Sequence, residues 1–240
     1  KDKPVIKVLQ GIRRSGKSFM LELLSRKIME KGAAENQILL LNMEDFENAE
    51  LLDAKNLYDF IKSKSEAAGG KKLYLFLDEV QEVEAWEKLV NSLYSSATID
   101  ADIYITGSNA NLLSSELATY LSGRYVLIHV WPLSYREFLY FNSENDSAAA
   151  FRKFIEFGGF PGLKDMMENP VQIRSYLEGI YSTVLLKDVI ARNRIRDTAG
   201  LEKIILYIAD NTGNIFSAKR ISDFMKSGGR PLSVETIYND

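Results

Sequence analysis

The chain has 240 residues, 46% hydrophobic and 26% charged, which is typical of a globular protein with a core and excludes disordered, collagen-like and low-complexity chains. With no cysteine and a single histidine, it cannot form disulfides, use a thiolate nucleophile or build a metal site from cysteine or several histidines. A net charge of −3 gives no bulk attraction to polyanions, and without an apolar run of about 18 residues we expect a cytoplasmic protein with no membrane span.

Strand and helix patterns alternate over the first half of the chain. Short apolar runs, typical of strands buried on both faces, are separated by segments with apolar residues at helical spacing. The predicted strands cover 5–9, 37–42, 73–77, 102–106 and 125–130. The predicted helices between them cover 18–31, 50–65, 85–96 and 112–121. This alternation predicts an α/β fold, with a parallel sheet between helices, over residues 1–133.

Only helical patterns follow this region. The predicted helices cover 134–141, 148–157, 171–191 and 199–210. Ser217 is typical of the residue that caps a helix, and a last helical pattern begins at Ser233. The sequence starts at Lys1 rather than Met and stops soon after this last pattern begins, so we expect a fragment of a longer chain.

The first motif is a glycine-rich loop between the first predicted strand and helix. It fits the pattern G-x-x-x-x-G-K-[S/T] and consists of Gly11, Ile12, Arg13, Arg14, Ser15, Gly16, Lys17 and Ser18. The loop amides and the helix N-terminus suit a phosphate, Lys17 can reach its β- and γ-groups, and the Ser18 hydroxyl can bind Mg²⁺. The loop binds through its amides, so Arg13 and Arg14 are not required. The motif predicts ATP and Mg²⁺ as ligands.

An acidic pair ends the strand predicted over 73–77. Asp78 is placed to hold the Mg²⁺ water shell and Glu79 to orient or deprotonate the attacking water. The alternative is that the pair only caps the following turn. Glu44 and Asp45 end the second strand, which we expect at the sheet edge, away from the metal.

One extra strand separates the P-loop from the acidic pair in the sequence. This arrangement indicates the P-loop class in which the fourth strand lies between the first and third, giving the strand order 5-1-4-3-2. The fourth strand would then point Asn109 or Ser108 between Lys17 and Glu79, toward the γ-phosphate or the water. Alternatively, these two residues only cap the next helix.

The set GIRRSGKS, LFLDEV, ITGSNA, LSGR, WPLSYREF and GGFP resembles the bacterial and archaeal AAA-type ATPases that carry an uncharacterised C-terminal domain. The resemblance implies an AAA+-like or signal-transduction-type P-loop core over 1–133, an all-α lid over 134–197 and a truncated winged helix over 198–240. It also implies that Arg124 serves the γ-phosphate of a neighbouring subunit, or else forms a structural salt bridge. Pro161 would contact the nucleotide from the lid, or else form a plain helix–helix turn.

These features lead to one main functional hypothesis and one alternative. The first is an ATPase that hydrolyses ATP, with Glu79, Lys17, Asn109 and Arg124 as catalytic residues, to drive a conformational switch. A homo-oligomer is one of its candidate assembly states. The alternative is a nucleotide-gated regulator whose winged helix binds DNA or a protein partner. A cluster of arginines at 192, 194 and 196 could meet phosphate, although a solvated basic face is commoner. No guanine-binding signature is present, which disfavours a GTPase.

Overall fold

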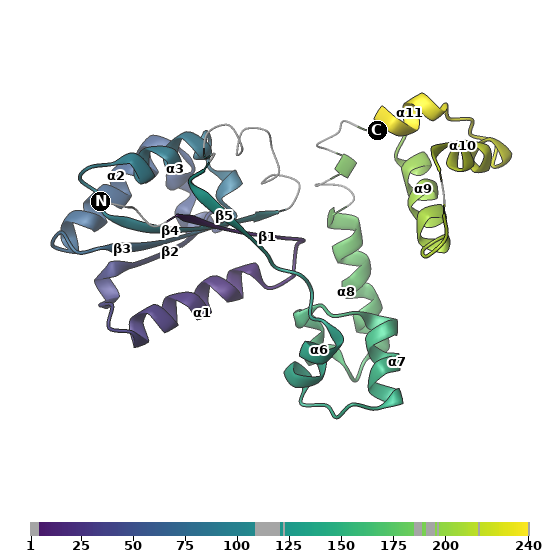
Figure 1. Cartoon of the computed structure of the whole chain (residues 1–240), viewed down its shortest axis with the longest axis horizontal. Helices are drawn as coiled ribbons and strands as arrows, with labels where there is room; N and C mark the ends of the chain where they lie inside the picture. Colours follow the sequence, from purple (N-terminus) through teal and green to yellow (C-terminus); the bar gives the residue numbers. More distant parts are fainter. Residues whose placement is uncertain are drawn as a thin grey trace. The chain divides into compact units, whose positions relative to one another are not determined.

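A computed structural model describes residues 5–108, 121, 123–184, 189–190, 195, 197–215 and 217–239 (Figure 1). The chain divides into two compact units, Lys1–Ile180 and Tyr181–Asp240. Across the described ranges, no helix combines the length and the apolar character needed to cross a membrane. The division into core, lid and winged helix stays a prediction.

The first unit is built on a five-stranded parallel sheet. Its strands are β1 (Ile6–Gly11), β2 (Ile38–Asn42), β3 (Leu73–Asp78), β4 (Ala101–Ser108) and β5 (Tyr125–His129). Their order is β2-β3-β4-β1-β5, and every pairing is parallel. This confirms the predicted sheet and its order. Since all five strands run the same way, the residues that follow them gather at one edge of the sheet.

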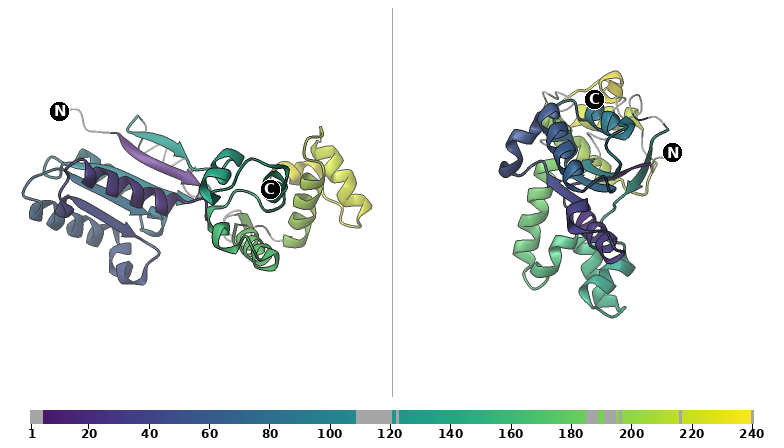
Figure 2. Two further views of the ribbon diagram at one scale, coloured as in Figure 1. Left: turned by 90° about the horizontal axis from the view of Figure 1, so that it is seen from below. Right: turned by 90° about the vertical axis from the view of Figure 1, so that its left-hand side faces the viewer.

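Helices cover the two faces of the sheet with separate apolar cores. Helix α1 (Lys17–Glu30) covers one face, and α2 (Ala54–Ala67) and α3 (Trp86–Ser95) cover the other (Figures 1 and 2). On the first face, Leu21 packs with Leu9 and Phe76. The larger core on the second face holds the buried residues of α2 and α3. These layers hold the sheet, and with it the strand ends, in place.

Helix α2 begins four residues later than the sequence predicts. A 3₁₀ helix occupies Phe46–Leu52, and α2 starts at Ala54. The Asp53 carboxylate accepts hydrogen bonds from the amides of Lys55 and Asn56, both at 2.9 Å. An aspartate in this position stabilises the first turn of a helix by about 1 kcal/mol, so the cap decides where the helix begins.

A helical region completes the first unit. It contains α6 (Tyr135–Asn142), α7 (Ala148–Phe157), the 3₁₀ helix Pro161–Met166 and most of α8 (Pro170–Thr183). Ser134 caps α6, and its hydroxyl and amide donate hydrogen bonds to the Glu137 carboxylate, which lowers the pKa of that group. The helices predicted over 134–141 and 148–157 are confirmed. The prediction over 171–191 reaches beyond α8 into a stretch that is only partly described.

The second unit contains α9 (Thr198–Asp210), α10 (Ala218–Ser227) and α11 (Val234–Asn239). Ser217 caps α10 as predicted, because its hydroxyl accepts a hydrogen bond from the Arg220 amide at 3.3 Å. Charges are balanced in residues 197–215 and 217–239, which carry five basic and five acidic side chains: Lys203, Lys219, Arg220, Lys226 and Arg230 against Asp197, Glu202, Asp210, Asp223 and Glu235. The predicted arginine cluster at 192, 194 and 196 lies outside the described residues.

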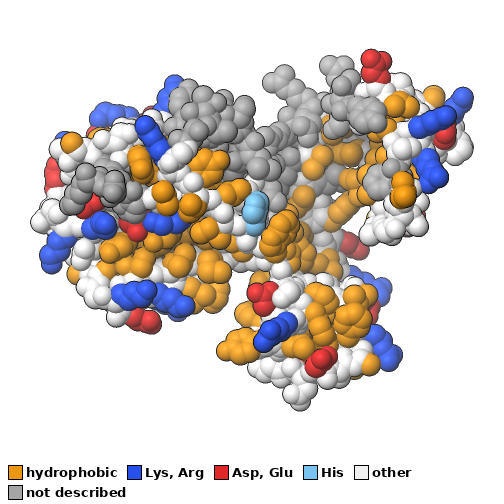
Figure 3. Space-filling model, viewed as in Figure 1, with side chains coloured by type: hydrophobic (Ala, Val, Ile, Leu, Met, Phe, Trp, Pro, Cys, Tyr) orange, Lys and Arg blue, Asp and Glu red, His pale blue; other side chains and the backbone are white. Residues whose placement is uncertain are grey.

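Several large apolar side chains of the first unit reach the surface. Phe19 and Met20 are 55% and 39% exposed on α1, where hydrophobic side chains gather on the face seen in Figure 3. Val126 and Ile128 are exposed on β5, at the edge of the sheet. Apolar atoms make up more than half of the surface of most folded proteins, so exposed apolar side chains such as these are normal.

Candidate active site

The P-loop connects β1 to α1 through backbone conformations that favour glycine. Gly16 has φ of 100°, in the left-handed region, just before α1 begins at Lys17. A methyl group at Gly11 would lie 2.2 Å from the carbonyl oxygen of Val130, so only glycine fits there. Arg14 is also left-handed, with φ of 66°. The loop is therefore a tight turn whose amides precede a helix N-terminus, the arrangement that binds phosphate.

Lys17 is buried at the bottom of this loop, with its side chain only 3% exposed. Its ammonium donates hydrogen bonds to the carbonyl oxygens of Gly11 and Ile12, at 3.1 and 3.3 Å. It also lies 3.5 Å from Oε1 of Glu79. The ammonium is therefore held by two hydrogen bonds and one ion pair. The pairing brings two residues 62 positions apart, both predicted for the site, into direct contact.

Asp78 and Glu79 lie at the carboxyl end of β3, both almost fully buried. Thr106, at the end of β4, joins them: its hydroxyl donates to Oδ1 of Asp78 and accepts a hydrogen bond from the Glu79 amide at 2.9 Å. Thr106 has no exposed surface. Sequence reasoning missed this residue. The sequence signal that could have found it is a hydroxyl residue near the end of the strand that lies between the P-loop strand and the acidic strand.

Replacing Thr106 with Val should destabilise the site, because the change keeps the shape but removes both hydrogen bonds. The buried Asp78 carboxylate and Glu79 amide would each lose a partner, at a cost of about 1–3 kcal/mol per group in the free energy of unfolding. Urea denaturation of both proteins measures this difference. Thr106→Ser keeps the hydroxyl and should retain most of the stability. Equal stability of the Val variant and the parent would contradict the bridging role.

Glu79 is held at both carboxylate oxygens and in an uncommon backbone conformation. Its φ and ψ are 51° and 48°, left-handed for a residue that is not glycine. Lys17 faces Oε1, and the Gln81 side-chain amide donates to Oε2 at 2.7 Å. Non-glycine residues held in sparsely populated conformations cluster at functional sites. The local geometry therefore turns the Glu79 carboxylate toward the P-loop.

Glu44 follows the edge strand of the sheet. The sequence analysis expects it at the sheet edge, away from the metal, and β2 is confirmed as an edge strand. The Met43 amide continues the pairing with β3 by donating to the Asp78 carbonyl at 3.0 Å. The Glu44 carboxylate lies 3.1 Å from both terminal guanidinium nitrogens of Arg13 in the P-loop, a contact that the sequence analysis does not predict. Arg13 accordingly ties the P-loop to the end of β2.

The residues predicted for Mg²⁺ have donor atoms of the right kind. Asp78 supplies a carboxylate of which one oxygen is held by Thr106, and Ser18 supplies an exposed hydroxyl on the first turn of α1. Mg²⁺ is commonly bound in proteins by one or two carboxylates together with substrate phosphates and water. One carboxylate and one hydroxyl beside a phosphate-binding loop therefore fit this ion.

The lid meets the P-loop at Pro161. A methyl group at Gly16 would lie 3.7 Å from Cγ of Pro161, in ordinary contact. The Leu133 amide donates to the Gly159 carbonyl at 2.7 Å, and a methyl group at Gly159 would lie 2.0 Å from the Leu133 carbonyl oxygen. The close backbone contact requires glycine at position 159. Pro161 therefore lies next to the loop, and its contact with a nucleotide stays a prediction.

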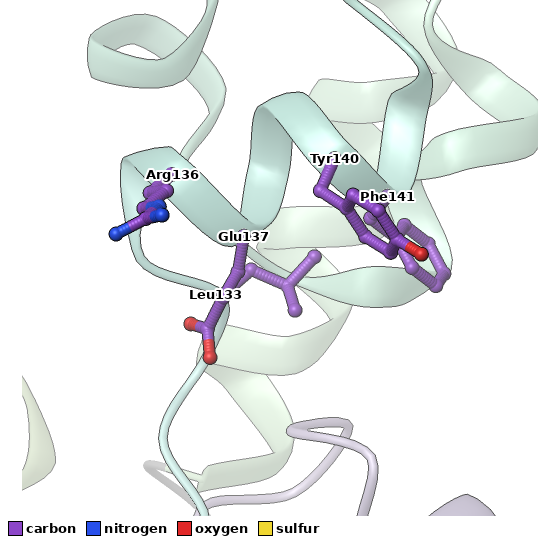
Figure 4. Close-up of a pocket in the computed structure, with 5 residues that line it drawn as sticks. All are labelled: Leu133, Arg136, Glu137, Tyr140 and Phe141. Carbon is purple, nitrogen blue, oxygen red and sulfur yellow. The ribbon is translucent and has the colours of Figure 1, made fainter.

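A cavity of about 360 Å³ lies against α6 (Figure 4). It is lined by Leu133, Arg136, Glu137, Tyr140 and Phe141. Leu133 precedes Ser134, the cap of the helix, and the other four residues project from the helix. The cavity therefore belongs to the helical region of the first unit, close to the segment that joins this region to the sheet.

Arg124 lies at the opposite end of the sheet from the P-loop. It precedes β5, and its carbonyl accepts a hydrogen bond from the Ile6 amide at 2.8 Å. Along β1, the separation from Ile6 to Gly11 corresponds to about 17 Å, which an arginine side chain cannot span. Arg124 instead donates to Asn91 and stacks over the ring of Tyr94, both on α3. Asn109, the other predicted catalytic residue, lies outside the described residues.

Comparison with known proteins places this site in a family. The family model for the AAA domain matches residues 3–139, more than half of the chain. The chain belongs to the AAA domain family. In AAA domains the sheet and glycine-rich loop form the P-loop NTPase fold, which is a nucleotide-binding architecture. Residues 148–237 match a domain of unknown function, DUF8612.

Two relatives of this AAA domain protein extend over nearly all of the chain. An uncharacterized protein of Haemophilus influenzae is 40% identical over 99% of this chain and 59% of its own length. An uncharacterized protein of Methanocaldococcus jannaschii is 30% identical over 98% of this chain and 53% of its own length. The chain therefore spans between half and three-fifths of the length of these relatives.

Two solved structures are similar to the AAA domain chain at low identity. AMPPCP-bound DnaA from Aquifex aeolicus is 16% identical, with a TM-score of 0.44 over 85% of this chain and 62% of that one. The ORC1 protein of Aeropyrum pernix in complex with DNA is 12% identical, with a TM-score of 0.46 over 99% of this chain and 76% of that one.

Proposed function

We propose that this protein binds ATP with Mg²⁺ and hydrolyses it. The observation that carries the proposal is the contact between Lys17 and Glu79, which joins the P-loop to the acidic end of β3. A phosphate-binding loop, a buried ammonium and two buried carboxylates at one edge of the sheet are the groups that phosphoryl transfer to water requires. The AAA domain match supports the same reaction class.

Each residue has a role that follows from its position. The loop amides precede α1 and Lys17 is its first residue, so these groups would bind the β- and γ-phosphates at the helix N-terminus. Asp78 and Ser18 would hold Mg²⁺, which when bound neutralises phosphate charge. Glu79 would accept a proton from the water that attacks the γ-phosphorus. Asn109, by its place after β4, would contact the γ-phosphate.

ATP binding would change the partners of Lys17. In the structure its ammonium donates to two loop carbonyls and is paired with Glu79, so phosphate oxygens would replace at least one of these partners. Pro161 lies beside Gly16 of the same loop, so a shift of the loop would reach the lid directly. We propose that this is how hydrolysis drives a conformational switch.

Arg124 would act only on a neighbouring subunit, because its own P-loop is out of reach. It would first have to leave Asn91 and Tyr94 on α3. An arginine supplied to a γ-phosphate from another chain raises turnover by about 10³–10⁵-fold in other P-loop enzymes. The proposed enzyme would therefore be a homo-oligomer.

The test is ATP turnover per subunit, measured against protein concentration for the parent and for Arg124→Ala. A rate that rises with concentration and falls sharply in the variant is expected. Lys88→Ala, on the exposed side of α3, serves as the matched control and should behave as the parent. A rate that is independent of both concentration and Arg124 would reject the role of Arg124, and no turnover at any concentration would reject the ATPase.

The alternative, a DNA-binding regulator that acts through a winged helix, has no specific observation in its favour. Residues 181–240 carry nine basic and seven acidic side chains, a small excess, whereas DNA-binding domains have a strongly basic face. We therefore propose the ATPase alone.

A further inference from the structure

Gln81 contacts the residue that would activate the attacking water. It lies in the 3₁₀ helix Val80–Glu82, which directly follows Glu79. Its side-chain nitrogen donates to Oε2 of Glu79 at 2.7 Å. Its side-chain oxygen is buried and accepts no hydrogen bond from the part of the chain that the structure describes. No predicted role of the site accounts for this residue.

The chemistry of Glu79 determines which way the Gln81 amide points. An ionised carboxylate only accepts hydrogen bonds, so the amide nitrogen must face Glu79 and the amide oxygen must face elsewhere. A buried acceptor without a donor costs about 1–3 kcal/mol. A small ligand with an O–H or N–H group would satisfy this oxygen, and a water molecule is the smallest ligand of this kind.

The attacking water needs two acceptors. To direct a lone pair at the γ-phosphorus, it must hold both of its hydrogens away from the phosphate, each on an acceptor. Oε1 of Glu79 is one such acceptor, and it becomes available when ATP phosphates take Lys17 from it. The Gln81 oxygen is a second acceptor, on a side chain already bonded to the same carboxylate.

We propose that Gln81 orients the attacking water together with Glu79; this inference rests on the proposed ATP hydrolysis. The water oxygen forms a bond to the γ-phosphorus as the bond from phosphorus to the β,γ-bridging oxygen breaks, and ADP leaves with that electron pair. One water proton passes to Oε1 of Glu79. The other stays on the transferred oxygen, hydrogen-bonded to Gln81, which is itself unchanged. Gln81 also keeps Oε2 of Glu79 occupied, so only Oε1 faces the water.

The test compares Gln81→Met with Glu82→Met under saturating ATP and Mg²⁺. Methionine keeps the length of glutamine but has no comparable donor or acceptor, and Glu82 is an exposed neighbour on the same turn. We expect kcat of Gln81→Met to fall by about 10- to 100-fold, the scale of a misplaced reacting group. KM and the affinity for ADP should stay within about 2-fold of the parent, and Glu82→Met should match the parent throughout.

A second readout separates water orientation from a merely structural role. ADP with aluminium fluoride mimics the transferring phosphoryl group with its in-line water, so Gln81→Met should weaken this complex while leaving binding of ADP alone intact. If Gln81→Met fails to fold, Gln81→Glu replaces it, and it should also lose kcat because its carboxylate would repel Glu79.

The outcomes distinguish this inference from the proposed function. Hydrolysis by the parent, with kcat and aluminium fluoride binding unchanged in Gln81→Met, would overturn the role of Gln81 and leave the ATPase in place. Equal losses in Gln81→Met and Glu82→Met would also overturn it, since the effect would then belong to the turn. Absence of hydrolysis in the parent would overturn the proposed function, and this inference with it.

Discussion

Replacing Lys17 with Ala is expected to abolish ATP binding and to destabilise the protein at the same time. Binding would be lost because the buried ammonium is the side-chain cation of the P-loop. Stability would fall because the buried Glu79 carboxylate would lose its charged partner, a change that costs about 3–5 kcal/mol at buried ion pairs. Calorimetric titration with ATP and urea denaturation measure the two effects separately.

A double variant separates the two consequences. Lys17→Ala combined with Glu79→Gln removes both charges, so it should recover much of the stability but none of the ATP binding. Lys27→Ala, at the exposed far end of α1, controls for the loss of one lysine from the helix and should bind ATP as the parent does. ATP binding by Lys17→Ala with parental affinity would contradict the proposed phosphate site.

Replacing Glu79 with Gln is expected to stop hydrolysis while ATP still binds. A positioned general base contributes about 10²–10⁴-fold to the rate, and glutamine cannot take the proton. Lys17 would lose a charged competitor for the phosphates, so ATP affinity should be unchanged or tighter. A single-turnover assay with γ-labelled ATP measures the chemical step, and titration with ATP measures binding.

The control for this prediction lies on the same turn. Glu82→Gln makes the same chemical change on an exposed side chain three residues away and should leave turnover unchanged. Parental turnover in Glu79→Gln would show that another group accepts the proton. Loss of ATP binding in this variant, with turnover lost only as a result, would show instead that Glu79 shapes the phosphate site.

The strands of the sheet could be predicted because each is encoded by a short continuous segment of the sequence. Apolar runs such as Ile38–Asn42 are too short for helices, so strands of a parallel sheet are the remaining interpretation. The expected burial of this strand on both faces is wrong, because β2 lies at the sheet edge and exposes Leu40. The extra strand that precedes the acidic pair in the sequence then predicted the order of the strands. In this class of sheet, one other strand lies between the strand that leads to the P-loop and the strand that ends at Asp78. The start of α2 was harder to predict, because helical periodicity does not distinguish the 3₁₀ helix from the α-helix that follows Asp53.

The site could be predicted only as far as its motifs extend. Lys17, Asp78 and Glu79 stand in patterns with fixed spacing, and the structure brings Lys17 and Glu79 into contact. Thr106 bonds to Asp78 from a neighbouring strand, and Gln81 bonds to Glu79 from the turn that follows it, and no motif spacing covers either contact. The contact between Glu44 and Arg13 likewise joins two segments that no motif links.

Two of the contacts that join the sheet, the P-loop and the helical region of the first unit are made by main-chain atoms. The Val130 amide donates to the Gln10 carbonyl at 2.7 Å, just before Gly11, and the Leu133 amide donates in the same way to Gly159. Only two residues, Trp131 and Pro132, separate these two junctions. A movement of the loop would therefore pass to the lid with little help from side chains. Most side chains around this hinge could then be exchanged without uncoupling the lid, whereas a single added methyl group at Gly11 or Gly159 would obstruct it.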